Sequence, residues 1–315
     1  MSIETLRARR GGTQSGTFTT FYIAHKNTHM VELSPLSPSF AARLTGVDLT
    51  QEIDDDSWHV VEAAHHRHPV LVLPDQTISD DQQVAFSERF GVLETTKPGT
   101  VGSGSKVVVL TNLDHAGNIV ATSHRQILNG RANQQWHTDS SFKVIAAKAS
   151  LLSARIVPQS GGQTEFICMR TVYAALPAAL RQQVEGQVAI HDYAYGRGQI
   201  DPNLVTDEER EALPPVEQAM VINHGEGVKS LYIGAHCKAI KGLTWEQSRQ
   251  LIDKLTAFAT QEQFVYRHDW EADDLVIWNN RATLHRGVPF RSAEARRLMV
   301  RTTVAGDMST LAAAG

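Results

Sequence analysis

Apolar residues recur at helical spacing in the first third of the chain. Residues 54–68 begin with three aspartates, place Trp58, Val61 and Ala64 on one face, and stop before Pro69. Acidic residues favour the first turn of a helix, and a proline lacks the N–H that would continue one. The pattern therefore predicts a helix over residues 54–68.

Further helices are predicted where end signals and apolar periodicity coincide. Capping boxes beginning at Ser79 and Thr244 each precede apolar residues at helical spacing, and Gly91 is the expected C-terminal cap of the first. Another helix is predicted over residues 170–185. In contrast, residues 196–215 are polar, contain glycine, proline and acidic residues, and show no period. They predict a mobile loop, a candidate lid over a site.

Short apolar runs bounded by turn residues predict strands rather than helices. Their positions are 70–73, 106–110, 151–157, 230–233, 274–278 and 298–304. These strands are scattered among a few helices without regular alternation of strand and helix. This order favours a mainly β protein, a sandwich or barrel with helical additions, over a doubly wound α/β fold.

The amino-acid composition limits the classes of protein to which the chain can belong. The chain has 315 residues, 42% of them hydrophobic and 20% charged, which suffices for a large core. A net charge of -4 gives no basic surface for nucleic acid or an anionic membrane. No apolar run reaches the ~18 residues of a membrane span. Two cysteines, Cys168 and Cys237, are too few for a disulfide framework and indicate reduced thiols in a cytoplasmic enzyme.

Domain boundaries follow from the same patterns. Residues 1–29 carry several arginines, threonines, serines and glycines without an apolar signal core, and predict a disordered N-terminal extension. Residues 30–307 are expected to form a single domain, followed by a tail over 308–315. The oligomeric state stays open, with a homo-oligomer as one alternative.

Three residues match the ligand set of a non-haem iron centre. On an extended strand, residues two apart point to the same face, so His137 and Asp139 would project together. His285 follows a predicted strand 148 residues after His137 and would supply the third ligand. Two imidazoles and one carboxylate bind Fe(II) on one side and leave positions open for co-substrate and oxygen. A hydrogen-bonded histidine beside a surface aspartate is the alternative explanation of the first pair.

Several segments around these residues match one family. They are 133–142, 160–166, 233–236, 264–268, 274–281 and 285–287. In these segments the chain resembles the taurine/2,4-dichlorophenoxyacetate dioxygenases, which are Fe(II)- and 2-oxoglutarate-dependent oxygenases, and it is most similar to the 2,4-dichlorophenoxyacetate branch. The resemblance implies a double-stranded β-helix (jelly-roll) core, with His137, Asp139 and His285 as iron ligands and O2 as the oxidant.

The resemblance also assigns the binding of the co-substrate. It implies that Arg297 and Thr164 grip the far carboxylate of 2-oxoglutarate, as a charge-assisted pair would. Arg301 lies four residues after Arg297, about 13 Å along the same strand face at ~3.3 Å per residue. The two arginines can therefore serve two separate anions. No neighbour on its own strand neutralises Arg301, so we expect an anionic substrate to do so.

Polar and aromatic residues near the predicted iron ligands are candidates for binding the substrate. The resemblance points to Arg301, the backbone N–H of Ser140, Asn133 and Trp136. His236 and His224 are further candidates, although a lone histidine is more often structural.

The expected reaction is hydroxylation of a small anionic substrate, with release of succinate and CO2. No side chain beyond the metal ligands is needed as an acid or base. An aryloxyacetate is the first choice, since hydroxylation beside its ether oxygen yields a phenol and glyoxylate. Alternatives within the class are a sulfonate, an aryloxypropionate or an N-acyl amino acid. A non-catalytic cupin-like binding protein or a zinc hydrolase is the remote alternative.

Overall fold

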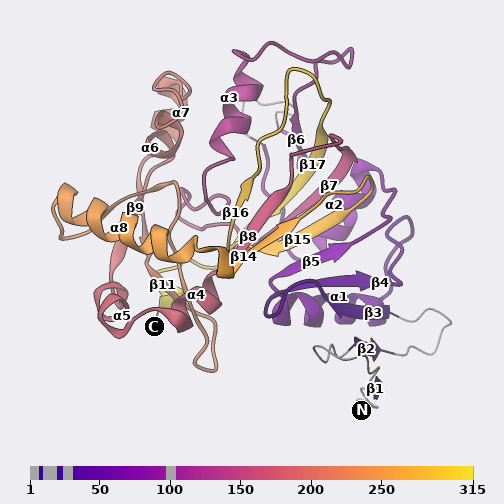
Figure 1. Ribbon diagram of the computed structural model, residues 1–315, viewed down its shortest axis with the longest axis horizontal. Coiled ribbons are helices and arrows are strands. Elements are labelled where there is room, and N and C mark those ends of the chain that lie inside the picture. The colour runs from indigo at the N-terminus through magenta and orange to yellow at the C-terminus, as the bar shows by residue number, and fades with distance from the viewer. Residues whose placement is uncertain (1–6, 10–19, 24–30, 97–103, 315) are drawn as a thin grey trace.

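A nine-stranded sheet forms the centre of the computed structural model, which describes residues 7–9, 20–23, 31–96 and 104–314 (Figure 1). In spatial order its strands are β1 (Arg7–Arg9), β2 (Thr20–Ile23), β3 (Val31–Pro35), β4 (Ala41–Thr45), β5 (Val70–Leu73), β15 (Leu275–Asn279), β7 (Ala149–Ile156), β17 (Leu298–Val304) and β6 (Val108–Thr111). Neighbouring strands are antiparallel except for β4 and β5, which run parallel. Strands from both ends of the chain are therefore neighbours in the middle of this sheet.

Three smaller sheets complete the β structure of the described residues. One consists of β14 (Val265–His268), β8 (Thr164–Cys168) and β16 (Thr283–Gly287). The others are β10 (Val216–Ala219), β9 (Val188–His191) and β13 (Cys237–Ile240), and the pair β11 (Val221–Asn223) and β12 (Lys229–Leu231). Phe166 of β8 contacts Trp278 of β15, with ring centroids 5.6 Å apart. The β8 sheet therefore packs face to face against the large sheet.

The central strands are apolar on both faces because both are covered. In β5, Leu71 and Leu73 pack on one side, whereas Val70 and Val72 pack on the other beside Phe166. This explains why the run of four apolar residues shows no polar alternation. Helices α1 (Asp55–Arg67) and α2 (Asp80–Glu88) cover the first side, with their aromatic residues in the same apolar cluster.

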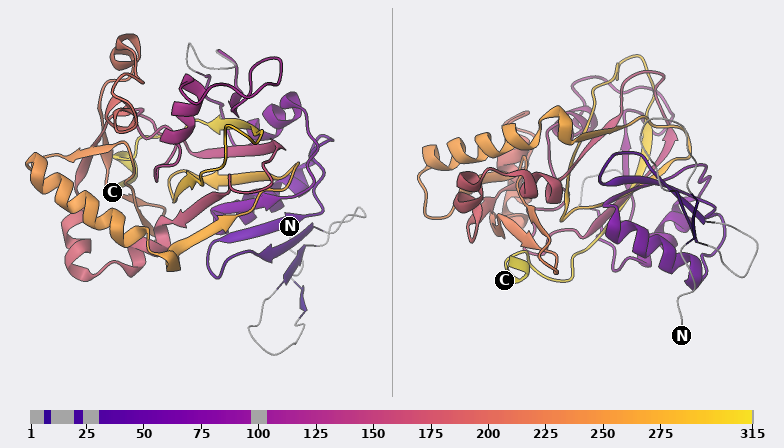
Figure 2. Two further views of the ribbon diagram at one scale, coloured as in Figure 1. Left: turned by 45° about the horizontal axis from the view of Figure 1, so that its top comes forward. Right: turned by 60° about the horizontal axis from the view of Figure 1, so that its bottom comes forward.

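The remaining helices lie over the smaller sheets and at one end of the molecule. Helices α4 (Met169–Ala175), α5 (Ala178–Val184) and α8 (Trp245–Ala259) share an apolar cluster at the end opposite α1 (Figures 1 and 2). Helices α3 (Arg125–Ala132), α6 (Tyr193–Gly198) and α7 (Asp207–Ala212) gather at the top of Figure 1. Short 3-10 helices are η1 (Glu262–Phe264) and η2 (Ala312–Ala314). Among the described residues, no helix is long and apolar enough to cross a membrane.

Most predicted elements are confirmed, and three predictions are wrong. The helix predicted over 170–185 is two helices, because Pro177 lies between α4 and α5 and Leu176 takes an extended ψ of 133°. The loop predicted over 196–215 contains the end of α6 and all of α7, which begins at a capping box on Thr206. Helix α2 ends at Glu88, and its C-cap residue is Arg89 rather than Gly91.

The two ends of the chain are attached to the domain where they are described. Within the predicted extension, β1 and β2 pair with each other and β2 pairs with β3, while most of residues 1–29 lie outside the described residues. At the other end, Thr310 is 1% exposed and its hydroxyl accepts a hydrogen bond from the Ala219 N–H. The residues after Asp307 therefore pack back onto the β10 region.

One buried amide connects three parts of the fold. The Asn280 side chain is fully buried, and its Oδ1 accepts hydrogen bonds from Trp278 Nε1 at 2.9 Å and the Asp139 N–H at 3.2 Å. Its Nδ2 donates to Ser150 Oγ at 2.9 Å. This amide therefore fixes the segment around Asp139 to β7 and β15.

We expect Asn280→Ala to lower the free energy of unfolding by at least about 2 kcal/mol. The substitution leaves two buried N–H donors without their acceptor, and each such loss costs roughly 1–3 kcal/mol. Urea denaturation measures the change. The control is Asn203→Ala in an exposed turn, where we expect a change within about 0.5 kcal/mol. Equal losses in both variants would contradict the role of the buried amide.

Candidate metal centre and its cavity

A single backbone pair brings the two predicted histidine ligands together. His137 and His285 form an isolated antiparallel bridge, in which each N–H donates to the other carbonyl at 3.0 and 2.8 Å. Directly opposed residues in a ladder present their side chains on the same face. The two imidazole rings consequently lie with centroids 4.2 Å apart.

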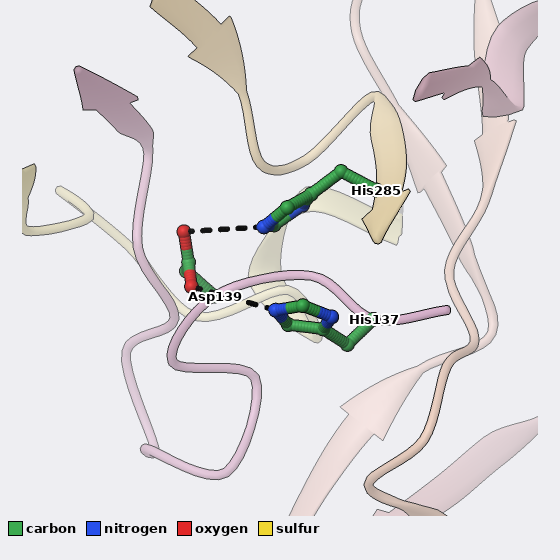
Figure 3. A group of neighbouring side chains, drawn as sticks. All are labelled: His137, Asp139 and His285. Atoms are coloured by element: carbon green, nitrogen blue, oxygen red, sulfur yellow. Dashed lines mark ion pairs between the residues drawn. The ribbon is translucent and has the colours of Figure 1, made fainter. Parts of the chain in front are cut away.

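Asp139 completes the group, as Figure 3 shows. Its Oδ1 lies 4.0 Å from His137 Nε2 and its Oδ2 lies 3.7 Å from His285 Nε2. One ligand atom from each residue falls within 4.8 Å of the others, and all three side chains are buried. The structure therefore assembles the three residues that the sequence singled out, from two segments far apart in the chain.

The Asp139 carboxylate is held in its charged form. Burial would raise its pKa, but the positive charge of Arg301 and the hydrogen bond from Ser150 lower it below the usual range. Arg301 Nη1 donates to Oδ1 at 2.6 Å, and Ser150 Oγ donates to Oδ2 at 2.7 Å. Hydrogen bonds of this kind fix the orientation of a metal-binding carboxylate.

Both histidines are neutral and one has a defined tautomer. Burial lowers the pKa of His137 and, more strongly, that of His285. The Nδ1 atom of His137 faces the Gln135 carbonyl oxygen at 2.8 Å, so Nδ1 carries the proton and Nε2 offers its lone pair. Two neutral imidazoles and one carboxylate with these atoms converging fit a divalent iron ion.

A cavity of about 1280 Å³ opens beside the three residues. Small-molecule sites are usually about 300–1,000 Å³, so this cavity has room for two ligands. Thr164 and Arg297 both line it. No carboxylate lies within ion-pair distance of Arg297 in the described ranges, and burial lowers its pKa to about 10. A buried cation of this kind is stabilised when an anion arrives.

Neighbouring groups fix the Arg297 backbone and the Thr164 hydroxyl. The Arg297 N–H donates to Asn112 Oδ1 at 2.8 Å, and its carbonyl accepts from Thr111 Oγ1 at 2.8 Å. The Thr164 hydroxyl accepts a hydrogen bond from Trp270 Nε1 at 3.0 Å and can still donate its own proton. The pair therefore offers a charged fork and a hydroxyl donor inside the cavity.

Some of the predicted substrate contacts line the cavity and others do not. Asn133, Ser140 and His236 line the cavity. Ser140 has a φ of 53°, and its hydroxyl donates to Glu94 at 2.7 Å. In contrast, Trp136 is not among the lining residues: its ring lies 4.6 Å from the Arg286 guanidinium and packs on the apolar cluster of α4 and α8. It faces away because its neighbour His137 faces the cavity.

Two further expectations about polar residues need correction. His224 is not among the residues that line the cavity, and its Nε2 lies 2.8 Å from Ser230 Oγ, so the structure does not place it beside the other candidates. Arg301 lines the cavity but is not without a counter-ion, because Asp139 neutralises it from another segment. Reasoning along its own strand could not find a partner 162 positions away.

Several charged residues that line the cavity were not singled out from the sequence, and Arg197 is one of them. Arg197 of α6 lines the cavity, and its Cζ lies 5.6 Å from the ring centroid of Tyr193. The residue falls in the stretch expected to be a mobile loop. A capping signal was available there, because the Asp192 side chain accepts the N–H of Tyr195 at the start of α6.

The chain is similar to several known dioxygenases over most of its length. The chain is 38% identical over 284 residues to the alpha-ketoglutarate-dependent 2,4-dichlorophenoxyacetate dioxygenase of Cupriavidus pinatubonensis, covering 88% of this chain and 98% of that protein. It is 34% identical to the (S)-phenoxypropionate/alpha-ketoglutarate-dioxygenase of Sphingobium herbicidovorans, covering 88% and 95%. The crystal structure of AAD-2 with Mn(II) and N-oxalylglycine has 37% identity and a TM-score of 0.82, covering 89% and 98%.

The family assignment rests on nearly the whole domain. Residues 32–303 match the sequence model described as taurine catabolism dioxygenase TauD, TfdA family. The alpha-ketoglutarate in the names of the relatives is 2-oxoglutarate. The chain therefore belongs to the TauD/TfdA family and is a dioxygenase that uses Fe(II), 2-oxoglutarate and O2.

Proposed function

We propose that this dioxygenase hydroxylates an aryloxyacetate-type carboxylate at the carbon beside the ether oxygen. One oxygen atom of O2 enters the substrate and the other enters succinate as 2-oxoglutarate loses CO2. The resulting hemiacetal collapses to a phenol and glyoxylate. The observation that carries the proposal is one cavity that joins the His137–Asp139–His285 group to a buried arginine and a large apolar wall.

We assign the metal to His137, Asp139 and His285. Their Nε2 and carboxylate atoms converge, both imidazoles are neutral, and the carboxylate is ionised. When bound there, Fe(II) supplies the activation of O2 that no side chain can provide. The protein's own groups hold and orient the reactants and exclude water. No other acid or base is required.

Arg297 and Thr164 are proposed to bind the far carboxylate of 2-oxoglutarate. The support is their shared position in the cavity, the absence of a counter-ion for Arg297 among the described residues, and the hydroxyl proton that Thr164 can still donate. A guanidinium and a hydroxyl together recognise a carboxylate in a fixed orientation.

The substrate is proposed to occupy the rest of the cavity. Ser140 through its backbone N–H, Asn133, His236 and the N–H groups of Arg301 not used by Asp139 supply the polar contacts. Apolar side chains fit an aromatic ring, and those that line the cavity include Val108, Leu110, Leu113, Val120, Ile127, Phe142, Ile156, Phe290 and Leu298. Trp136 is left out because it faces away.

Names of the relatives support a carboxylate first and a sulfate ester second. Two relatives at 38% and 35% identity are named for 2,4-dichlorophenoxyacetate, and two at 34% and 30% for phenoxypropionate. Another at 31% is named a sulfate ester dioxygenase. Sulfonates and N-acyl amino acids stay as alternatives for this chain. Family membership argues against a cupin-like binding protein or a zinc hydrolase.

The proposal also covers the fold, the domain boundaries and the cellular compartment. The opposed β8 and β15 sheets support a double-stranded β-helix (jelly-roll) core. We propose a single dioxygenase domain over 30–307, with residues 1–29 as an extension and 308–315 as the end that packs back. Two free buried cysteines support a cytoplasmic setting.

The function is tested by succinate release from purified protein with Fe(II), 2-oxoglutarate and a panel of acids. We expect phenoxyacetate to stimulate succinate formation with one phenol released per succinate. Phenoxyacetamide, the neutral analogue, should lose most of kcat/KM because it brings no charge to the cavity. A sulfate ester that outperforms every carboxylate would reassign the substrate, and no stimulation by any anion would refute the proposal.

Each of His137→Ala, Asp139→Ala and His285→Ala is expected to abolish turnover while the fold survives. Each removes one of three proposed protein ligands from a cavity wall rather than from the packed core. Succinate formation and far-UV circular dichroism measure the two effects. The control is His59→Ala on the exposed face of α1, which should keep wild-type activity. Normal turnover in any triad variant would remove that residue from the metal site.

Arg297→Gln should raise the KM for 2-oxoglutarate about 10- to 150-fold, the range of a lost charge-assisted contact. The KM for the substrate should change much less. Steady-state kinetics with varied co-substrate measure both values, and Arg291→Gln, an exposed arginine paired with Glu294, is the control. An unchanged KM for 2-oxoglutarate would transfer the role to another arginine of the cavity.

A further inference from the structure

The cavity contains a charged residue that the reaction has not yet used. Arg197 lies on α6, between the proposed metal ligands and the α3 wall, and lines the cavity with His137, Asp139 and His236. Its Nη1 donates to the Asn129 carbonyl of α3 at 3.1 Å. Its Cζ lies 5.6 Å from the ring centroid of Tyr193. These contacts hold the guanidinium at the cavity wall.

No carboxylate lies within ion-pair distance of Arg197 in the described part of the chain. Its Nε is buried and has no hydrogen-bond acceptor there. Burial is the main cause that lowers the pKa of Arg197, and the positive charge of Arg301 acts in the same direction, while Tyr193, Asp139 and Glu209 offset only part of this effect. A buried cation with unused N–H donors is costly unless an anion binds it.

The nearby carboxylates are already engaged. Glu209 of α7 pairs with Arg125 of α3 at 2.7 Å, across the rim of the same cavity. Asp139 accepts from Arg301 and from Ser150 on its two oxygens. Arg301 consequently forms an ion pair with Asp139, whereas Arg197 has no carboxylate within ion-pair distance among the described residues.

We propose that Arg197 binds the acidic group of the substrate and is the main residue that selects an anion. The inference rests on the proposed function and deepens it, because it names the group that recognises the substrate's charge. A carboxylate or a sulfate ester can accept hydrogen bonds from both the Nε–H and the Nη–H groups of a guanidinium. Phe142, Tyr193 and His236 form an aromatic group beside Arg197, with Phe142 and Tyr193 centroids 4.8 Å apart. An aryl group next to the acid would contact these rings.

The alternative is that Arg197 only ties α6 to α3 through the Asn129 carbonyl. A purely structural residue would affect charged and neutral substrates alike. The discriminating quantity is therefore the ratio of kcat/KM for phenoxyacetate to that for phenoxyacetamide.

The experiment compares wild type with Arg197→Gln, Arg197→Lys and the control Arg125→Gln, which removes the rim arginine that already has a carboxylate. We expect Arg197→Gln to lower the acid-to-amide ratio about 10- to 150-fold, with the KM for 2-oxoglutarate changed little. Arg197→Lys should recover part of the ratio because it restores the charge without the fork. Arg125→Gln should leave the ratio near the wild-type value.

Anaerobic calorimetry with Mn(II) and 2-oxoglutarate measures substrate binding without turnover. We expect the Kd of phenoxyacetate to rise by a similar factor in Arg197→Gln. An unchanged ratio and Kd, or an equal loss for acid and amide with a lowered Tm, would overturn the inference and leave the proposed function intact. Wild-type protein that binds neither phenoxyacetate, phenoxypropionate nor an alkyl sulfate would overturn both.

Discussion

The site depends on the burial of one carboxylate, Asp139, between the two sheets. A charge removed from water is stable only when partners replace its hydration. Here Arg301 and Ser150 hydrogen-bond its two oxygens, and His137 and His285 lie within 4.0 Å of them. The same partners fix the direction of the carboxylate, so the group that is costly to bury becomes an oriented metal ligand.

The fold supplies these partners from distant segments. β16 brings His285 opposite His137, β7 brings Ser150, and β17 brings Arg301. The Asn280 amide ties the Asp139 backbone to Ser150 and Trp278, so ligand positions and core packing depend on the same buried hydrogen bonds. The arginines have different roles: Arg301 orients the Asp139 carboxylate, while Arg297 and Arg197 line the cavity with no described carboxylate within ion-pair distance.

Local sequence signals predicted the elements whose causes are local. The capping boxes predicted the starts of α2 and α8, and apolar runs predicted the central strands. Pro177 is itself a local signal for the break between α4 and α5, although the prediction of one helix over 170–185 ignored it. His137 and Asp139 followed from strand alternation, whereas His285 needed the family resemblance as well. The partner of Arg301, the outward direction of Trp136 and the charge of Arg197 could not be predicted, because each depends on contacts between segments far apart in the chain.

Metal affinity tests the central claim most directly. Asp139→Asn keeps the shape of the side chain and removes its charge, and it leaves Arg301 without its counter-ion. Anaerobic calorimetry with Fe(II) should show one ion bound per wild-type chain and binding at least about 100-fold weaker in Asp139→Asn, because a charged ligand is lost. Equal Fe(II) affinity and stoichiometry in the two proteins would contradict the account of Asp139 as the residue on which the site is built.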